Sequence, residues 1–476
     1  MSPTRVALSH DDVHITYAEL ADKANRLAAA LRARGVNRGD RVAYLGPNHP
    51  AAVETFFATG LLGAAYLPLN ARLTEAELLF VIRDASPAAL VVGPGYGAVP
   101  GAPQVLDPLT PLPDADPIDA PVGLDDLCLI MYTSGTTGRP KGAMLTHANL
   151  TWNVYNHLID LDLRGEDVTL VTAPLFHIAA LAQSLLPTLI KGGRAVILSA
   201  FDADRVLELI ETERVTSMFG VPAMYAFIAG SPRWAEADLS SLRLLECGGA
   251  PVPEPLIRTY QDRGLTFLQG YGMTEASPGV LYLSPADSVR KAGTAGVPAF
   301  FTDVKLDGAP VRKPASEQGS EPDGEQGSEQ GEILVRGPNV FAGYWGLPDE
   351  NAAASTEDGW FRSGDVAVRD EDGFYRVVDR VKDVIISGGE NVYPAEVESA
   401  LLTHPEIVDS AVIGVPDERW GEVGKAFVVA TEPLRTADVL AHLDGRLARY
   451  KIPKYVEFVA ELPRTASGKI LRRELR

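Results

Sequence analysis

Short apolar runs alternate with segments of helical periodicity along the N-terminal half of the chain. An apolar run bounded by polar segments is typical of a strand that is covered on both faces of a parallel sheet. Such runs lie at residues 42–45, 90–92, 127–131, 168–172, 195–198 and 244–245. Residues 203–212, between two of these runs, have helical spacing. We therefore predict a largely parallel α/β architecture.

A helix is predicted close to the N-terminus. Thr16 and Glu19 have the spacing of a capping box, in which each residue satisfies a backbone N–H of the other. Apolar residues then recur at helical spacing over 20–31, and Gly35 is placed to end the helix.

The most apolar stretch, residues 51–69, predicts a buried helix. It contains Glu54 and several Gly and Ala residues, and the chain has no run of eighteen apolar residues. A membrane span is therefore not expected. The first twelve residues lack the apolar core of a signal peptide, so a cytoplasmic location is expected.

The composition changes near residue 314. Residues 314–332 are polar, acidic and repetitive, which predicts a flexible loop. Beyond it, apolar runs at 332–335, 374–378 and 384–387 predict strands, and residues 394–403 and 437–448 predict helices. The last ninety or so residues are therefore expected to form a small α+β domain.

Composition and charge restrict the class of protein. The chain has 476 residues, more than one compact core, so we expect two or three structural units. Its formal net charge of -20 argues against nucleic acid as a partner. Its two cysteines, Cys128 and Cys247, form neither a disulfide framework nor a cysteine-based zinc site, and we interpret them as buried spectators.

The most informative segment is residues 132–142, YTSGTTGRPKG. It follows an apolar run, and the carboxyl end of a strand is where α/β folds bind ligands. Glycines permit close backbone approach, hydroxyls donate hydrogen bonds and a lysine supplies charge, so the segment predicts a polyphosphate-binding loop. The residues expected to bind ATP are Thr133, Ser134, Gly135, Thr136, Thr137, Gly138 and Lys141. The spacing is not that of a Walker A loop.

Further motifs follow in a fixed order: PLFHIAAL, GGAPVP, QGYGMTEA, WFRSGD, DRVKD, SGGENVYPAEVE and PRTASGKI. With this series the chain resembles the adenylate-forming superfamily, which includes acyl-CoA synthetases, nonribosomal-peptide adenylation domains and beetle luciferases. The last two motifs resemble fatty-acyl and aryl-CoA ligases most. The resemblance implies a large multi-sheet N-terminal domain, a small mobile C-terminal domain, and an enzyme that converts a carboxylic acid to acyl-AMP, releases pyrophosphate and transfers the acyl group to coenzyme A.

The resemblance also implies the nucleotide site. Thr274 is expected to contact the α-phosphate and Glu275 to bind Mg²⁺, while Tyr271 stacks on adenine. Asp365 is expected to hold the ribose hydroxyls, with Arg380 beside it. The small residues expected to line the adenine and acyl pockets are Gly248, Gly249, Ala250, Gly270 and Gly272.

Two half-reactions need different groups at one site. Lys469 matches the lysine that bridges the carboxylate and the α-phosphate, so Lys469, Thr274, Glu275 and Lys141 are the expected catalytic residues. Lys382 matches a hinge between an N-terminal domain at 1–379 and a mobile domain at 384–476, with the hinge at 380–383. The resemblance implies that rotation replaces Lys469 with a loop bordering the coenzyme A channel, formed by Ser387, Gly388, Gly389 and Glu390.

His177 matches a gate at the acyl site, although a core histidine bonded to a backbone carbonyl is the alternative. Other residues expected to line the acyl pocket are Ala179, Phe219, Val221 and Val297. They are apolar and several are small, which favours an uncharged tail, either a medium- or long-chain fatty acid or an aryl acid.

Two alternatives remain open. The activated acid could pass to a carrier-protein thiol or another nucleophile, or the chain could be a non-catalytic nucleotide-binding relative. The intact Thr274, Glu275, Asp365, Arg380 and Lys469 argue against the second. The expected cofactors and co-substrates are ATP, Mg²⁺ and coenzyme A, and a homodimer is left open.

Overall fold

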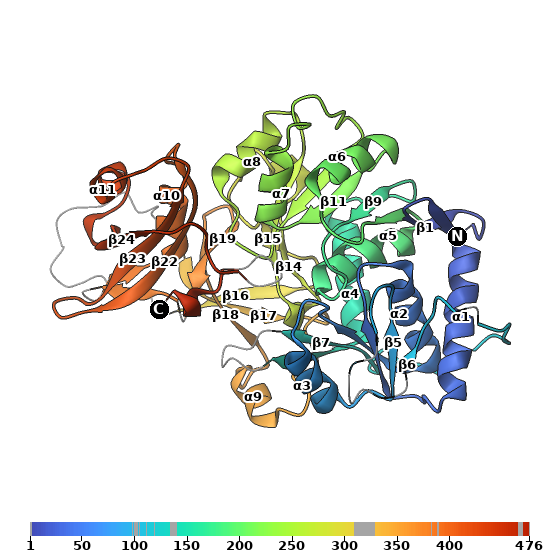
Figure 1. Cartoon of the computed structure of the whole chain (residues 1–476). Helices are drawn as coiled ribbons and strands as arrows, with labels where there is room; N and C mark the ends of the chain where they lie inside the picture. The colour runs from blue at the N-terminus through green and yellow to red at the C-terminus, as the bar shows by residue number, and fades with distance from the viewer. Residues whose placement is uncertain are drawn as a thin grey trace.

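The computed structural model describes residues 2–97, 99, 103, 105–110, 112–118, 120–133, 140–308, 329–381, 383–387, 390–464 and 470–475. Four sheets organise the chain. Figure 1 shows a large body on the right, and the C-terminal sheet with its two helices on the left.

The first sheet has nine strands and carries most of the predicted site. Its central strands are parallel, and β14, β15 and β2 run antiparallel at its edges. Its order is β15 (Val297–Pro298), β14 (Gly279–Tyr282), β13 (Phe267–Gly272), β12 (Leu244–Cys247), β11 (Ser217–Gly220), β9 (Val168–Val171), β10 (Arg194–Ile197), β1 (Val6–His10) and β2 (Val13–Thr16). The predicted parallel core is thus confirmed.

The second sheet has six strands and is parallel except for its last pair. Its order is β6 (Val105–Leu106), β5 (Ala89–Val92), β3 (Arg41–Leu45), β4 (Ala65–Leu69), β7 (Leu127–Thr133) and β8 (Lys141–Thr146). The strands β7 and β8 therefore flank the predicted phosphate loop.

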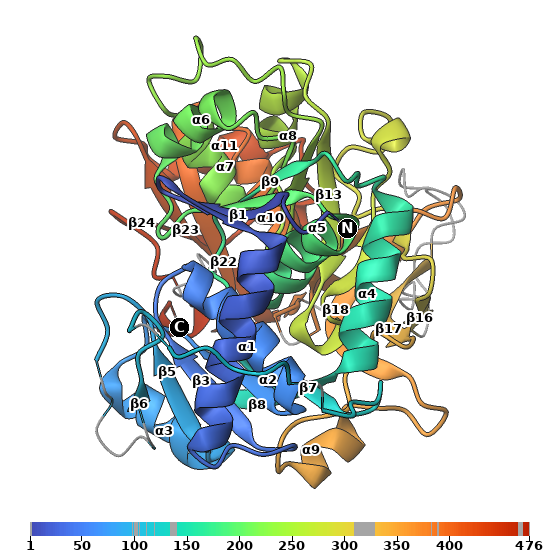
Figure 2. The same ribbon diagram turned by 90° about the vertical axis from the view of Figure 1, so that its right-hand side faces the viewer.

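Helices between the two sheets form the largest apolar core. Side chains from both sheets meet those of α1 (Tyr17–Ala33), α2 (Pro50–Leu62), α4 (His147–Asp160), α5 (Leu186–Lys191) and a π-helix, η1 (Ala179–Leu185). In Figure 2, α1 runs downward from β1, with β3 and β5 to its left and α2 to its right. The outer faces are covered by α3 (Glu75–Ala85) on the second sheet and by α6 (Ala203–Thr212), α7 (Pro222–Ala229) and α8 (Glu254–Gln261) on the first.

Local sequence signals explain where two of these helices begin and end. The capping box of Thr16 and Glu19 starts α1, as predicted. The prediction of one buried helix over 51–69 is wrong at its end. The helix stops at Leu62 because Gly63 takes a left-handed conformation (φ +66°), and the chain continues as β4.

The third sheet is antiparallel and adjoins the first. Its order is β16 (Asp303–Asp307), β17 (Glu329–Arg336), β18 (Phe361–Arg369) and β19 (Tyr375–Arg380), and α9 (Pro348–Ala353) follows β17. The predicted loop over 314–332 is too long at its end, because β17 begins at Glu329 and pairs with β18. Residues 309–328 lie outside the described part.

The C-terminal sheet has its own apolar core. It contains β20 (Ile385–Ser387), β21 (Glu390–Val392), β22 (Ile407–Asp417), β23 (Gly421–Ala430) and β24 (Tyr455–Phe458), with helices α10 (Pro394–Leu401) and α11 (Thr436–Leu443). Both helices are shorter than predicted. The second ends early because Asp444 is extended and Gly445 has φ +77°. Short 3₁₀ helices are η2 (Thr274–Ala276), η3 (Pro285–Asp287), η4 (Arg449–Lys451) and η5 (Arg472–Glu474).

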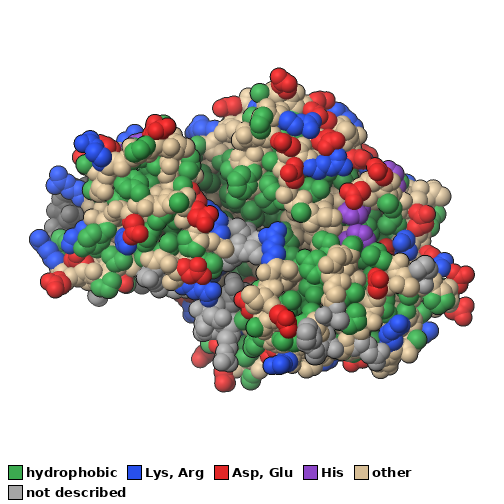
Figure 3. Space-filling model, in the orientation of Figure 1, with side chains coloured by type: hydrophobic (Ala, Val, Ile, Leu, Met, Phe, Trp, Pro, Cys, Tyr) green, Lys and Arg blue, Asp and Glu red, His purple; other side chains and the backbone are tan. Residues whose placement is uncertain are grey.

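The surface in Figure 3 is hollowed between the C-terminal sheet and the large body. Within the described ranges, no helix is long and apolar enough to cross a membrane.

Candidate active site

Three predicted nucleotide-binding residues meet where the first and third sheets adjoin. Tyr271 on β13 donates a hydrogen bond to Asp365 on β18, with 2.7 Å between Oη and Oδ2. Arg380 on β19 lies directly opposite Asp365, and its Nε is 3.1 Å from Oδ1. Burial raises the pKa of Tyr271, so its hydroxyl stays protonated and donates. The carboxylate is therefore oriented by a neutral and a charged donor.

The residues Thr274 and Glu275 follow β13 in the short helix η2. The backbone carbonyl of Glu275 accepts a bond from the Phe341 N–H (2.9 Å), and its Oε1 accepts one from the Tyr344 hydroxyl (2.8 Å). Sequence reasoning missed Tyr344, because no motif links it to Glu275.

A magnesium ion bound to ATP fits this donor set. Mg²⁺ is typically held by one or two carboxylates together with phosphate oxygens and water. In the parts of the chain that the structure describes, no group of three or more His, Cys, Asp or Glu side chains could hold a metal on its own. A single carboxylate at Glu275 is therefore suited to a metal that arrives with the nucleotide.

Lys141 begins β8 on the far side of the same tyrosine. Its Nζ pairs with Glu350 of α9 at 2.5 Å and lies 5.2 Å from the centre of the Tyr344 ring. Only 12% of the lysine side chain is exposed. Glu350 thus holds the lysine beside the tyrosine, and this partner was also missed from sequence.

The phosphate loop itself lies mostly outside the described residues. Thr133 ends β7, partly buried, with Oγ1 3.5 Å from the Lys141 carbonyl oxygen. The predicted residues Ser134, Gly135, Thr136, Thr137 and Gly138 fall in the undescribed segment.

Glycines after β12 pack closely beside Phe219 and Val221. A Cβ on Gly248 would lie 3.1 Å from the carbonyl oxygen of Gly270 and 3.6 Å from the Phe219 ring. Gly249 has φ +80° and faces Val221. The structure therefore brings together five of the predicted small or apolar pocket residues, and Ala250 follows them directly.

Local packing requires a glycine at position 272. A Cβ there would lie 2.1 Å from the Pro278 carbonyl oxygen, so a side chain cannot be accommodated. It allows the tight return from β13 through η2 to β14.

His177 is partly buried just before η1, which contains Ala179. Burial, together with the charge of Arg72, lowers the pKa of His177 to about 4, so the imidazole is neutral near pH 7. Its Nε2 has no hydrogen-bond partner among the described residues. The ring packs against Phe176 with 4.9 Å between centroids.

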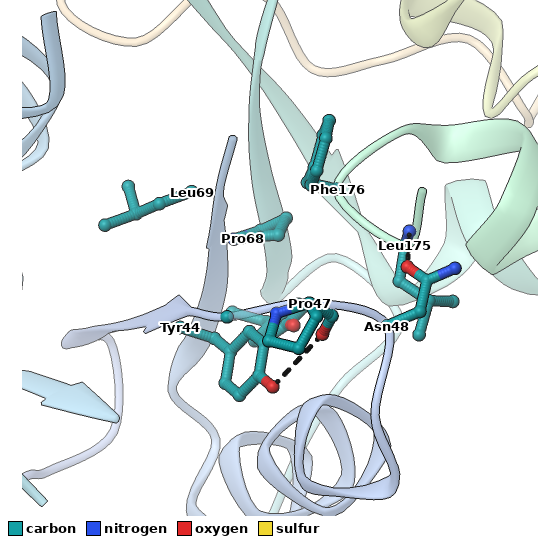
Figure 4. Close-up of a pocket in the computed structure, with 9 residues that line it drawn as sticks. Tyr44, Pro47, Asn48, Pro68, Leu69, Leu175 and Phe176 are labelled. Atoms are coloured by element: carbon teal, nitrogen blue, oxygen red, sulfur yellow. Dashed lines mark hydrogen bonds between the residues drawn. The ribbon is translucent and has the colours of Figure 1, made fainter. Parts of the chain in front are cut away.

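Asn48 positions the segment that leads to His177. Its Oδ1 accepts a bond from the Leu175 N–H (2.8 Å), and its amide donates to the Ala173 carbonyl (2.9 Å). Figure 4 shows a cavity of about 10 Å³ beside this contact, lined by residues that include Tyr44, Pro68 and Phe176. Sequence reasoning missed Asn48, which comes from the loop after β3.

The predicted acyl-pocket residue Val297 lies at an edge of the first sheet. Val297 lies on the edge strand β15, two strands from Gly270, and is 38% exposed. It follows Gly296, which has φ +93° and packs against the Tyr282 backbone. Val297 pairs with Tyr282 of β14, which in turn pairs with Gly270 of β13.

The residues expected at the hinge and at the coenzyme A channel are only partly described. After β19, the N–H of Val381 donates to the Gly364 carbonyl (2.9 Å) and that of Val384 to Arg380 (3.2 Å). Ser387 is buried at the end of β20 and lies opposite Glu390 of β21 in register. The predicted residues Lys382, Gly388, Gly389 and Lys469 lie outside the described residues.

The segment around Lys469 is bounded by described contacts. Arg464 and Ile470 form an antiparallel bridge, which brings the two ends of the segment together. Just beyond it, Arg472 Nη2 donates to both carboxylate oxygens of the buried Glu398 at 2.7 and 2.8 Å. The C-terminal tail is therefore anchored on α10.

Known proteins resemble this chain over its whole length. Residues 1–345 match the family of AMP-binding enzymes, and residues 396–469 match the AMP-binding enzyme C-terminal domain. A feruloyl-CoA synthase from Amycolatopsis is 56% identical, with 100% of this chain and 96% of that protein covered. An indoleacetate–CoA ligase from Aromatoleum aromaticum is 42% identical, with coverage of 100% and 95%.

Among solved structures, an o-succinylbenzoate CoA synthetase from Bacillus subtilis in complex with its acyl-adenylate intermediate has a TM-score of 0.89 at 34% identity, covering 100% of this chain and 96% of that one. The same enzyme has been solved with ATP and a magnesium ion. The match over both domains, together with the Tyr271, Asp365 and Glu275 arrangement, identifies the chain as a member of the AMP-binding enzyme family, an AMP-forming acyl-CoA synthetase that uses ATP and coenzyme A.

Proposed function

We propose that this enzyme activates an aryl carboxylic acid and joins it to coenzyme A. The observation that carries the proposal is the group of apolar and small residues behind β12, in which Gly248 packs beside the Phe219 ring and Gly249 beside Val221. The feruloyl-CoA synthase and indoleacetate–CoA ligase relatives support an aryl acid over a fatty acid.

In the first half-reaction the carboxylate attacks the α-phosphate of ATP, and pyrophosphate leaves. Both reactants are anions, so the site must neutralise charge in the transition state. Thr274 donates to the α-phosphate, Asp365 holds the ribose and Lys141 approaches the phosphates. Bound Mg²⁺ at Glu275 supplies further charge neutralisation. Lys469 bridges the carboxylate and the phosphate.

In the second half-reaction the coenzyme A thiol attacks the acyl carbon and AMP leaves. Lys469 and the 387–390 loop lie about eighty residues apart in sequence, and each serves only one of the steps. Rotation at Lys382 exchanges them, with the large domain at 1–379 and the small domain at 384–476.

Freezing that hinge should separate the half-reactions. Proline at 382 fixes φ at about −65°, and so restricts the residue whose backbone must change conformation when the small domain rotates. We expect Lys382→Pro to release pyrophosphate in a single turnover but to lose most thioester formation, as measured by rapid-quench assays of both products. Acyl-CoA formation at the wild-type rate would rule out rotation about this residue.

Removing the Asp365 carboxylate, which is proposed to hold the ribose, should weaken the binding of ATP more than that of the acid. Hydrogen bonds to a charged group contribute about 1.5–3 kcal/mol, so we expect Asp365→Ala to raise the KM for ATP roughly 10- to 100-fold and to change that for the acid much less. Asp358→Ala is the matched control, since this exposed carboxylate pairs only with Lys305 and Thr356 among the described residues. An unchanged KM for ATP would remove Asp365 from the nucleotide site.

The proposed function is tested by pyrophosphate release across a panel of acids, with and without coenzyme A. The panel contains phenylpropenoic acids, indoleacetic acid, a long-chain fatty acid and a dicarboxylic acid, and a carrier-protein thiol replaces coenzyme A in a parallel series. We expect coenzyme A-dependent turnover to be fastest with an aryl acid. Faster turnover with the fatty acid, or transfer only to the carrier protein, would refute the proposal.

A further inference from the structure

A polar cavity lies beside Gly270, one of the predicted pocket residues. It has a volume of about 10 Å³, and its polar lining comes from Gln183 of η1, Glu246 of β12, Gln269 of β13 and Tyr282 of β14. Gly270 and three leucines complete it. The described lining contains no lysine or arginine, so nothing there balances a negative charge.

Glu246 is the centre of this cluster. Gln183 donates to its Oε2 at 2.6 Å, and Nε2 of the buried His157 lies 3.5 Å from its Oε1. Burial raises the pKa of Glu246 to about 8 and lowers that of His157 to about 3. Both groups are therefore mainly neutral near pH 7, and a protonated carboxyl can donate as well as accept a hydrogen bond.

Two residues that line the cavity each have a buried polar atom without a hydrogen-bond partner among the described residues. These atoms are the hydroxyl of Tyr282 and Oε1 of Gln269. Both ring nitrogens of His157, next to Glu246, are also buried without a hydrogen-bond partner in the described part of the chain. Buried polar atoms in native proteins are nearly always paired. A cavity of this size holds about one oxygen atom, either of water or of a ligand hydroxyl.

The cavity adjoins the predicted acyl-pocket residues through Gly270. Gly270 lines it and also faces Gly248, which borders the Phe219 ring. Gln183 belongs to the helix that follows His177. Four residues of extended chain, about 13 Å, separate Gly270 from Thr274, where the acid's carboxylate reacts. That length suits a single ring on a short linker and is too short for an extended long-chain fatty acid.

We propose that Glu246, with Gln183 and Tyr282, binds a hydroxyl group on the ring of the aryl acid at the end opposite its carboxylate. This inference rests on the proposed function and deepens it by naming the substrate class, a ring-hydroxylated aryl acid. A hydroxyl both donates and accepts, and so satisfies the mixed set of groups in the cavity. A site built to bind a hydroxyl discriminates strongly against an analogue that lacks it, because its own polar groups then stay unpaired.

The test compares kcat/KM for 4-hydroxyphenylpropenoic acid with that for unsubstituted phenylpropenoic acid. We expect the wild-type enzyme to prefer the hydroxylated acid roughly 10- to 100-fold. In Glu246→Leu and in Gln183→Leu this ratio should fall to within about threefold, while Glu246→Gln, which keeps a donor and an acceptor, retains most of it.

Thr169→Val is the matched control. Thr169 is a buried polar residue of the same sheet, bonded to Thr188 and Ser217 and absent from the cavity lining. Loss of the Thr169 hydroxyl should lower the stability of the fold and leave the kcat/KM ratio of the two acids unchanged. If Glu246→Leu does not fold, Gln183→Leu alone provides the test.

The outcomes separate the two proposals. An enzyme that ligates both aryl acids with equal kcat/KM overturns this inference and leaves the proposed function standing. An equal loss with both acids in the leucine variants makes the cluster a structural network and also overturns it. If no aryl acid is ligated, the proposed function itself fails.

Discussion

Lys469→Ala is expected to slow adenylate formation roughly 10²–10³-fold, the typical loss when one charged contact to the transition state is removed. Thioester formation from supplied acyl-AMP should remain close to the wild-type rate, because the lysine serves only the first half-reaction. The bridge of Arg464 with Ile470 and the anchoring of Arg472 on Glu398 do not involve the Lys469 side chain, so the variant should fold.

The measurement is a pair of assays, pyrophosphate exchange for the first step and acyl-CoA release from acyl-AMP for the second. Lys454→Ala is the control, because this half-exposed lysine of the same domain pairs with Asp417. Equal losses in both assays would show that the role of Lys469 is not restricted to the first half-reaction.

Glu275→Gln is expected to lower Mg²⁺-dependent turnover at least about 10²-fold, since a carboxylate ligand contributes several kcal/mol through the metal it holds. The glutamine oxygen can still accept the bond from the Tyr344 hydroxyl, so the local structure should persist. AMP binding, which we propose to depend on Tyr271 and Asp365, should be retained.

Initial rates across a Mg²⁺ titration, with AMP binding by calorimetry, check this expectation. Glu254→Gln is the control, because Glu254 is exposed and pairs with Arg258 one helical turn away. Tyr344→Phe tests whether the Tyr344 hydroxyl positions Glu275. This variant should need a higher Mg²⁺ concentration for half-maximal activity, although the carboxylate ligand is still present. A Glu275→Gln enzyme with wild-type Mg²⁺ dependence would place the metal elsewhere.

Prediction from sequence worked best where structure depends on neighbouring residues. The capping box of Thr16 and Glu19 and the helix over 203–212 were predicted correctly, since a helix is stabilised by contacts within a few residues. Only the end of the stretch 51–69 was predicted wrongly, because an apolar run has the same composition in a buried helix and a buried strand. The conformation of Gly63 decides between them.

The sequence by itself determined the α/β architecture and the order of the motifs, and it predicts Tyr271, Thr274, Glu275 and Asp365 as nucleotide-site residues. Each of these depends on a short segment that carries its own pattern.

Only the tertiary structure decided which groups complete the site. Lys141 meets Glu350 across 209 residues, Asn48 meets Leu175 across 127, and Glu275 meets Tyr344 across 69. It also decided that Glu246 lies in a polar cavity and that Val297 lies at a sheet edge. The physical reason is that strand order and helix packing bring these side chains together, and no local periodicity records which distant strand becomes a neighbour.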